Sequence, residues 1–272
     1  MVNEKYHGLG TAPSVIRELF AYGLQQAKVV GKENVFDYSL GNPSIPAPAK
    51  VNETIKKLID TTDSIQLHGY SMAPGFENVR QAIADNLNAR FNCNAKASEL
   101  FMTCGCAPAL VSVAHALTTS PEDEFIAIAP FFPEYNVFFT CAGAKLAVVP
   151  ADTVHFQIDM DALEKTINEH SVAVVINSPN NPSGVVYTEE TLTKIAELLE
   201  RKSKEYGHPI YIVADEPYRE LVYDGVKVTF IPNVYDNTIV CYSWSKSLSL
   251  PGERIGYVYV PEKCADAKAV YD

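Results

Sequence analysis

Several common sequence signals are absent from this chain, and each absence narrows its function. The 272 residues carry a formal net charge of −11 without a basic cluster, which argues against nucleic acid or an anionic membrane as the main partner. No apolar run is long enough to span a membrane, and the N-terminus MVNEKYHGLG lacks a signal-peptide core, so we expect a cytoplasmic protein. The six cysteines form no CxxC pair and the six histidines are scattered, which suggests buried free thiols and no metal site.

The chain does contain an alternation of short apolar runs and helical segments. From residue 99 onward, the runs LFMT, EFIAIA, KLAVV, VAVVIN, IYIVAD, TIVCYS and GYVYV occur, most of them separated by stretches of helical pattern. Several runs are nearly continuous in Ile, Val and Ala, as in strands that are buried on both faces. The pattern predicts an α/β protein, a three-layer α/β/α sandwich with a mostly parallel sheet. Upstream, we expect helices over 14–30, about 49–61 and about 76–91.

Ligands of such sheets bind beyond the carboxyl ends of the strands, and the polar motifs of this chain fall there. Residues 105–108, GCAP, follow the run LFMT and open a helix. This segment is either an ordinary turn or a phosphate cradle, because small side chains let an anion approach free helix amides. Residues 177–184, NSPNNPSG, follow VAVVIN and form either a plain turn or a rigid ligand-binding loop.

Two further motifs supply an acid and an amine. Asp215 ends the run IYIVAD, where a carboxylate either caps a helix or keeps a pyridine nitrogen protonated. Lys246 lies in SWSKSLSLPGER, where it is either a solvated loop lysine or the amine of a Schiff base. Partial burial beside a cation such as Arg254 would lower the pKa of Lys246 and free its amine. Together these residues look like the lysine site of a pyridoxal-phosphate (PLP) enzyme.

Taken in order along the chain, the motifs resemble the class I/II (aspartate aminotransferase-type) PLP-dependent enzymes of fold type I. The resemblance covers about residue 33 to the end of the chain. It depends on Gly-x-Ala, aromatic-Pro-x-Tyr, Asn-Asn-Pro-Ser-Gly, Asp-Glu-Pro-Tyr, Ser-x-Ser-Lys and Gly-Glu-Arg-Ile-Gly-Tyr. The last three of these motifs are highly specific.

The resemblance implies a role for each matching residue. Lys246 resembles the lysine that forms the Schiff base and then moves the substrate α-proton, and Asp215 resembles the partner of the pyridine nitrogen. Asn181 and Tyr218 match residues at the ring hydroxyl, and Phe132 matches the aromatic residue that stacks on the ring. The residues that match the phosphate site are Gly105, Cys106, Ala107, Ser243 and Arg254. Tyr70 matches a residue that reaches the phosphate of a neighbouring subunit, and Gly41, with Asn181, matches a residue near the substrate. Tyr218 would also serve in catalysis, and Tyr70 implies a homodimer.

The resemblance also implies a domain organisation. Residues 1–45 would be an N-terminal segment of a small domain, and residues 46–272 would be the PLP-binding large domain. The chain stops at Asp272, before the C-terminal part of the small domain, and no residue matches the arginine that clamps the substrate α-carboxylate in this family. We therefore expect residues 1–272 alone to turn over amino acids poorly.

The predicted activity is PLP-dependent transfer of an amino group between an amino acid and a 2-oxo acid, through a Schiff base on Lys246. Two alternatives remain open. One is a PLP-dependent lyase on the same fold, for example one that performs β-elimination, since it would use the same residues. The other is a non-catalytic, truncated PLP-binding fragment. The sequence leaves the amino-acid donor and acceptor open.

Overall fold

The computed structural model describes all 272 residues and contains one seven-stranded sheet in the order β1-β7-β6-β5-β4-β2-β3. The strands are β1 (Leu100–Thr103), β2 (Glu124–Ile128), β3 (Lys145–Val149), β4 (Ser171–Asn177), β5 (Tyr211–Asp215), β6 (Thr238–Ser243) and β7 (Gly256–Tyr259). Strand β7 is antiparallel to both of its neighbours, whereas the other six strands share one direction. The predicted mostly parallel sheet is therefore confirmed.

Ten α-helices accompany the sheet, and they include all of those predicted from the sequence. They are α1 (Glu4–Thr11), α2 (Val15–Val30), α3 (Ala49–Thr61), α4 (Ser64–His68), α5 (Glu77–Phe91), α6 (Cys106–Leu117), α7 (Tyr135–Cys141), α8 (Met160–Thr166), α9 (Glu189–Tyr206) and α10 (Ala267–Tyr271). Three short 3₁₀ helices cover Lys32–Asn34, Ala97–Glu99 and Ile231–Asn233. No helix combines the length and the apolar composition that a membrane span requires.

The chain divides into two compact units, Met1–Ile45 and Pro46–Asp272. The first unit contains α1 and α2, and Ser14 caps α2 by accepting a hydrogen bond from the amide of Arg17 at 3.5 Å. The second unit contains the sheet and the remaining α-helices.

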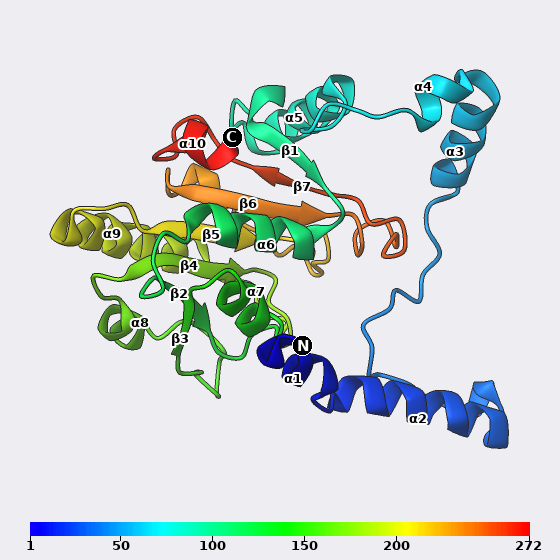
Figure 1. Ribbon diagram of the computed structural model, residues 1–272, viewed down its shortest axis with the longest axis horizontal. Helices are drawn as coiled ribbons and strands as arrows, with labels where there is room; N and C mark the ends of the chain where they lie inside the picture. The colour runs from blue at the N-terminus through cyan, green and yellow to red at the C-terminus, as the bar shows by residue number, and fades with distance from the viewer. The chain divides into compact units, whose positions relative to one another are not determined.

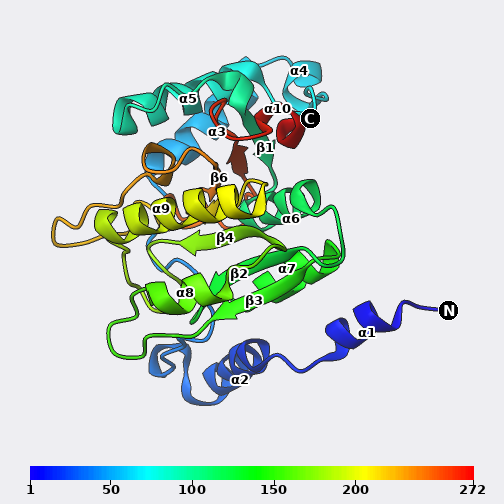
Figure 2. The same cartoon turned by 90° about the vertical axis from the view of Figure 1, so that its left-hand side faces the viewer.

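The second unit has three layers because successive side chains of a strand point to opposite faces of the sheet. In β4, Val174 and Ile176 join a core cluster with residues of α5, α8 and α9. Ala173 and Val175 of the same strand join a second cluster with residues of α6 and α7. Figures 1 and 2 show these helices on the two sides of the sheet. The predicted α/β/α sandwich is thus confirmed, with both faces of the sheet buried.

Candidate functional site

The carboxyl ends of the central strands bring three of the predicted motifs to one edge of the sheet. Asn177 at the end of β4 pairs in register with Asp215 at the end of β5, and Asp215 pairs with Cys241 in β6. Ser243 ends β6 and pairs with Gly256, which also pairs with Thr103 at the end of β1. The segments that follow β1, β4, β5 and β6 therefore leave the sheet at the same edge.

Asp215 lies in a closed polar environment at this edge. Its side chain is only 5% exposed, and the thiol of Cys106 donates a hydrogen bond to Oδ1 at 2.9 Å. The phenol of Tyr135 donates a hydrogen bond to Oδ2. Burial raises the pKa of Asp215, while the two hydrogen bonds oppose this rise because they stabilise the charged form. The carboxylate thus has a fixed orientation and spare acceptor capacity for one more donor.

The loop after β4 is held to Asp215 by Asn177, whose side chain is buried. Nδ2 of Asn177 donates to the backbone carbonyl of Asp215 at 2.7 Å, and Oδ1 accepts from the amide of Asn181 at 2.6 Å. Within the loop, Oδ1 of Asn180 accepts hydrogen bonds from the amide and the hydroxyl of Ser183 at 3.1 and 2.7 Å. These contacts define the main-chain position of Asn181, one of the predicted site residues.

Lys246 lies in the turn that follows β6 and is half-buried. The turn is closed by hydrogen bonds from the amide of Leu248 to the carbonyl of Trp244 and from the amide of Ser249 to the carbonyl of Lys246, both at 3.3 Å. Burial lowers the pKa of Lys246, as the sequence predicted. Burial alone accounts for this direction, and the contribution expected from the charge of Arg254 is not required.

A cation and a helix N-terminus lie together at Gly105. Gly105 has a φ of 104° and provides no side-chain cap for the first amides of α6. A Cβ atom at this position would lie 2.7 Å from Nη2 of Arg254, so the guanidinium rests directly against the glycine. Free helix amides beside an arginine are well suited to bind a phosphate group. The predicted neighbours Cys106 and Ala107 are among the first residues of this helix, although the Cys106 side chain points to Asp215.

The other predicted residues have different environments. Burial and the nearby Asp215 raise the pKa of half-buried Tyr218 to about 12, so its hydroxyl stays protonated. Phe132 packs edge-to-face on Tyr135, with ring centroids 5.8 Å apart. Tyr70 is fully exposed, and Gly41 belongs to the N-terminal unit, so the roles implied for these two residues remain predictions.

Sequence reasoning assigned no role to Tyr135, Asn177 or Arg219, although all three lie in or beside the quoted motifs. Arg219 is 4% exposed, forms an ion pair with Glu216 and lies over the ring of Tyr242 at 4.6 Å. Their closeness in the sequence could have indicated them, because each lies within four positions of a residue with a predicted role.

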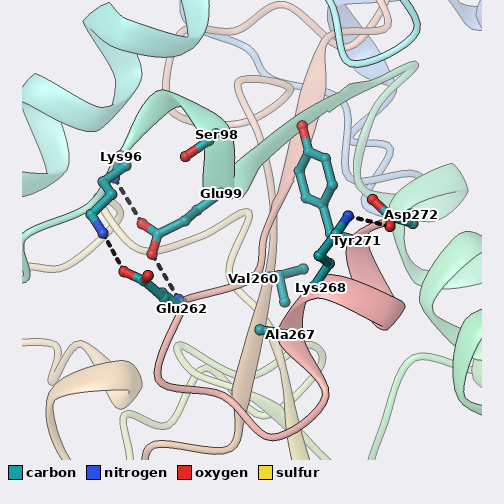
Figure 3. Close-up of a pocket in the computed structure, with 9 residues that line it drawn as sticks. All are labelled: Lys96, Ser98, Glu99, Val260, Glu262, Ala267, Lys268, Tyr271 and Asp272. Atoms are coloured by element: carbon teal, nitrogen blue, oxygen red, sulfur yellow. Dashed lines mark hydrogen bonds and ion pairs between the residues drawn. The ribbon is translucent and has the colours of Figure 1, made fainter.

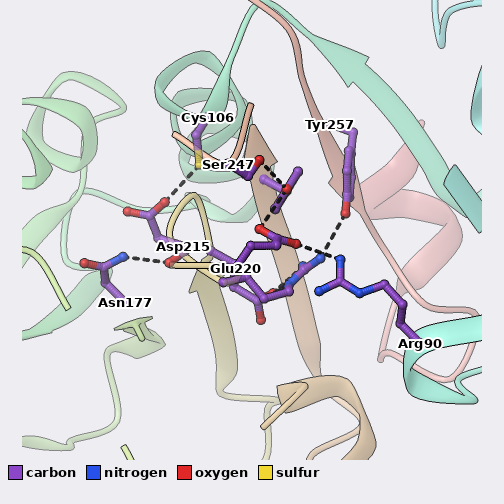
Figure 4. Close-up of polar contacts among 10 residues, drawn as sticks. Arg90, Cys106, Asn177, Asp215, Glu220, Ser247 and Tyr257 are labelled. Atoms are coloured by element: carbon purple, nitrogen blue, oxygen red, sulfur yellow. Dashed lines mark hydrogen bonds and ion pairs between the residues drawn. The ribbon is translucent and has the colours of Figure 1, made fainter. Parts of the chain in front are cut away.

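The segment after Asp215 is anchored by a second set of contacts, several of which Figure 4 shows. Glu220 accepts hydrogen bonds from Arg90 at 2.7 Å and from the hydroxyl of Tyr242 at 2.9 Å. The same hydroxyl is hydrogen-bonded to Ser247 at 3.0 Å, and Ser247 directly follows Lys246. The acid-bearing segment and the lysine-bearing turn are therefore joined through Tyr242.

A separate pocket of about 350 Å³ lies at the opposite edge of the sheet (Figure 3). Its lining comes from the residues that precede β1 and those that follow β7. Glu99 accepts hydrogen bonds there from the amides of Lys96 and Glu262, both at 2.7 Å. None of the predicted site residues lines this pocket, so it is distinct from the candidate site.

The chain is similar to known aminotransferases along most of its length. Residues 33–270 match the family model for aminotransferase class I and II. A probable N-acetyl-LL-diaminopimelate aminotransferase of Bacillus subtilis is 31% identical over 253 residues, which are 92% of this chain and 61% of that protein. Aromatic-amino-acid aminotransferase 2 of Thermococcus litoralis is 29% identical, again over 92% of this chain and 61% of that protein. The chain thus spans about 61% of the length of these curated relatives.

The fold is also similar to that of a solved aminotransferase. The crystal structure of an aminotransferase from Eubacterium rectale superposes with a TM-score of 0.97 and 59% sequence identity, over 100% of this chain and 68% of that one. Because the family model covers most of the residues, the chain belongs to the aminotransferase class I and II family.

Proposed function

We propose that this chain binds PLP and forms the cofactor-binding part of an aminotransferase that moves an amino group between an amino acid and a 2-oxo acid. The observation that carries the proposal is the buried carboxylate of Asp215, which shares a sheet edge with the turn of half-buried Lys246. The family supports this proposal, because aminotransferases of class I and II are generally PLP-dependent.

Three features of the chain fit the chemistry of PLP. The cofactor has a basic ring nitrogen, and the Asp215 carboxylate retains acceptor capacity beyond its bonds to Cys106 and Tyr135. Its phosphate suits the space at Gly105, where a side chain would collide with Arg254. Its aldehyde requires an amine that is neutral at moderate pH, and the pKa of Lys246 is lowered.

When bound, PLP would supply an aldehyde carbon and a protonated ring that accepts electrons from the substrate Cα. Asp215 would keep the proton on the ring nitrogen, and the Tyr218 hydroxyl and Asn181 amide would donate to the ring oxygen. The amine of Lys246 would first hold the cofactor and then carry the proton from the substrate Cα. This proton transfer needs the neutral amine, which burial favours.

The remaining groups would bind the cofactor and the substrate and orient them. The amides of Cys106 and Ala107, with Gly105, Ser243 and Arg254, would hold the phosphate. Phe132 would cover one face of the ring, and Asn181 would also contact the substrate. Gly41 keeps the role near the substrate carboxylate that its motif implies. We infer a cytoplasmic homodimer in which exposed Tyr70 reaches the partner's phosphate, with residues 1–45 belonging to a small domain and residues 46–272 to the PLP-binding domain.

The proposal is tested by loading the protein with PLP, reducing it with borohydride and mapping the labelled peptide. We expect a visible absorption band that disappears on reduction, with the label on Lys246. The variant K246A should lose the band, whereas K227A, a change in an exposed loop residue, should retain it. Label on another lysine would contradict the proposal. Assays for 2-oxo acid-dependent amino transfer and for release of pyruvate and ammonia would then distinguish a transferase from a lyase.

A further inference from the structure

The side chain of Cys106 makes a hydrogen bond that phosphate binding does not require. A residue at the start of a helix binds an anion through its backbone amide, and the preceding residue, Gly105, has no side chain at all. The thiol of Cys106 is buried and lies 2.9 Å from Oδ1 of Asp215, at the end of β5. The two residues are 109 positions apart in the chain, so the contact is made only in the fold.

The thiol is a donor in this contact. Burial, followed by the negative charge of Asp215, raises the pKa of Cys106 well above its usual range, so its sulfur keeps its proton. The other carboxylate oxygen accepts from Tyr135, whose pKa is raised for the same reasons. Each oxygen of Asp215 thus has one donor from a helix that packs on the same face of the sheet, α6 for the thiol and α7 for the phenol.

We propose that Cys106 is a positioning residue for the cofactor ring: its thiol and the Tyr135 phenol hold the Asp215 carboxylate from two sides and thereby strengthen its ion pair with the ring nitrogen. The inference rests on the proposed binding of PLP. The donors stabilise the ionised carboxylate, and an ionised carboxylate leaves the proton on the ring. Loss of one donor makes Asp215 more basic, so the shared proton moves toward the carboxylate and the ring loses positive charge.

The ring charge can be measured at Lys246 without turnover. A positively charged ring disfavours a second positive charge on the nearby nitrogen of the Lys246 linkage, so it lowers the pKa of that nitrogen. Other titratable groups around Asp215 are Glu216 and Tyr218 on the same segment and Cys241 in β6. Cys106 also contributes to the raised pKa of Tyr218, so a variant that keeps a donor at position 106 is needed to isolate the hydrogen bond to Asp215.

The experiment is an absorbance pH titration of the PLP-loaded protein and of C106A, C106S and C241A. Cys241 is a matched control, because it is a fully buried thiol that pairs in register with Asp215 but has no side-chain hydrogen bond to it. We expect the pKa of the linkage to rise in C106A by about half a unit, as for the loss of one weak hydrogen bond to a charge. It should stay near the wild-type value in C106S, since a hydroxyl also donates, and in C241A.

A wild-type titration in C106A would overturn the inference, and so would an equal shift in C241A, because that result would mean a general loosening of the core. If C106A does not fold, C106S and C106V provide the same contrast between a donor and an apolar group of similar size. Borohydride labelling of Lys246 in the wild-type protein separates the two proposals. Failure to label Lys246 refutes PLP binding, whereas labelling with unchanged titrations refutes only the role of Cys106.

Discussion

Asn177 fixes the distance between two loops that leave neighbouring strands, because its one side chain bonds to both of them. It donates to the carbonyl of Asp215 at 2.7 Å and accepts from the amide of Asn181 at 2.6 Å. The side chain is only 4% exposed, so water cannot readily replace either bond. The main chains of Asp215 and Asn181, which we propose to contact the nitrogen and the oxygen of the cofactor ring, are therefore held in one geometry before any ligand binds.

We expect N177A to lower the free energy of unfolding by about 2–3 kcal/mol, because two hydrogen bonds are lost, one of them buried and the other partly buried. It should also weaken PLP binding, since Asn181 and Asp215 lose their common support. The measurements are urea unfolding and PLP titration. N180A is the matched control, because Asn180 shapes the same loop through Ser183 without a bond to Asp215. Equal loss of PLP affinity in both variants would contradict the role given to Asn177.

A substitution at Gly105 tests whether the space beside Arg254 binds the phosphate group. G105A should weaken the binding of PLP and of inorganic phosphate, because the added Cβ would lie 2.7 Å from the guanidinium and displace it. It should also cost about 1 kcal/mol or more of stability, since the φ of 104° disfavours alanine. G225A is the control, with a φ of 75° and nothing within 4 Å of the added Cβ. If G105A binds phosphate as well as G225A does, Arg254 does not form the anion site.

Much of the fold could be predicted from the sequence because its signals are local. An apolar run such as VAVVIN specifies a strand buried on both faces, and β4 has that form. The direction of β7 could not be predicted, because a strand of four apolar residues has the same pattern whether it runs parallel or antiparallel. The short helices α4 and α10, with five residues each, were also missed, because one turn of helix has no measurable periodicity.

In the candidate site, too, residues in local motifs could be predicted, whereas contacts between distant residues could not. Asp215 and Lys246 could be predicted as site residues from motifs at or just after a strand end, which are local features, and their roles stay predictions. The contact of Tyr135 with Asp215 joins residues 80 positions apart, so no spacing in the sequence reports it. The direction of the Cys106 side chain likewise depends on how α6 packs on the sheet. Arg219 was overlooked because a charged residue is usually exposed, and only the fold provides its partners.

The buried ion pair of Arg219 and Glu216 provides a prediction about stability. Arg219 lies over three aromatic rings, at 4.6 Å from Tyr242 and 5.3 Å from Phe91 and Phe230. We expect R219M to lower the free energy of unfolding by about 3–5 kcal/mol, because Glu216 would remain buried without its partner. The double variant with E216Q should recover part of this loss.

The matched control for Arg219 is R201M. Arg201 pairs with Glu164 at 2.8 Å, but both side chains are about half exposed, so its loss should cost less than about 1 kcal/mol. The measurement is chemical unfolding followed by circular dichroism. Equal costs for R219M and R201M would mean that burial of the Arg219–Glu216 ion pair does not raise the cost of breaking it.

The charge of Asp215 is expected to favour PLP binding but to lower the stability of the folded protein without ligand. The variant D215N separates these two effects. Burial raises the pKa of Asp215 above its ordinary value of 3.8, so the folded protein ionises this group less readily than the unfolded chain does. Wild-type stability without ligand therefore falls as pH rises from 3.8 through the folded-state pKa, and the cost is complete above it. D215N has no charge to bury, so at neutral pH it should be more stable than the wild type by roughly 1 kcal/mol.

This advantage of D215N should shrink as the pH falls through the raised pKa of Asp215, because the wild-type carboxyl then becomes neutral as well. PLP should bind D215N roughly 10- to 100-fold more weakly, because a neutral amide cannot pair with a protonated ring nitrogen. Thermal unfolding between pH 4 and 8, with and without PLP, measures both effects. D60N, at an exposed position in α3, controls for the change in net charge. A D215N protein that is less stable than the wild type at every pH would show that the bonds from Cys106 and Tyr135 outweigh the burial of the charge.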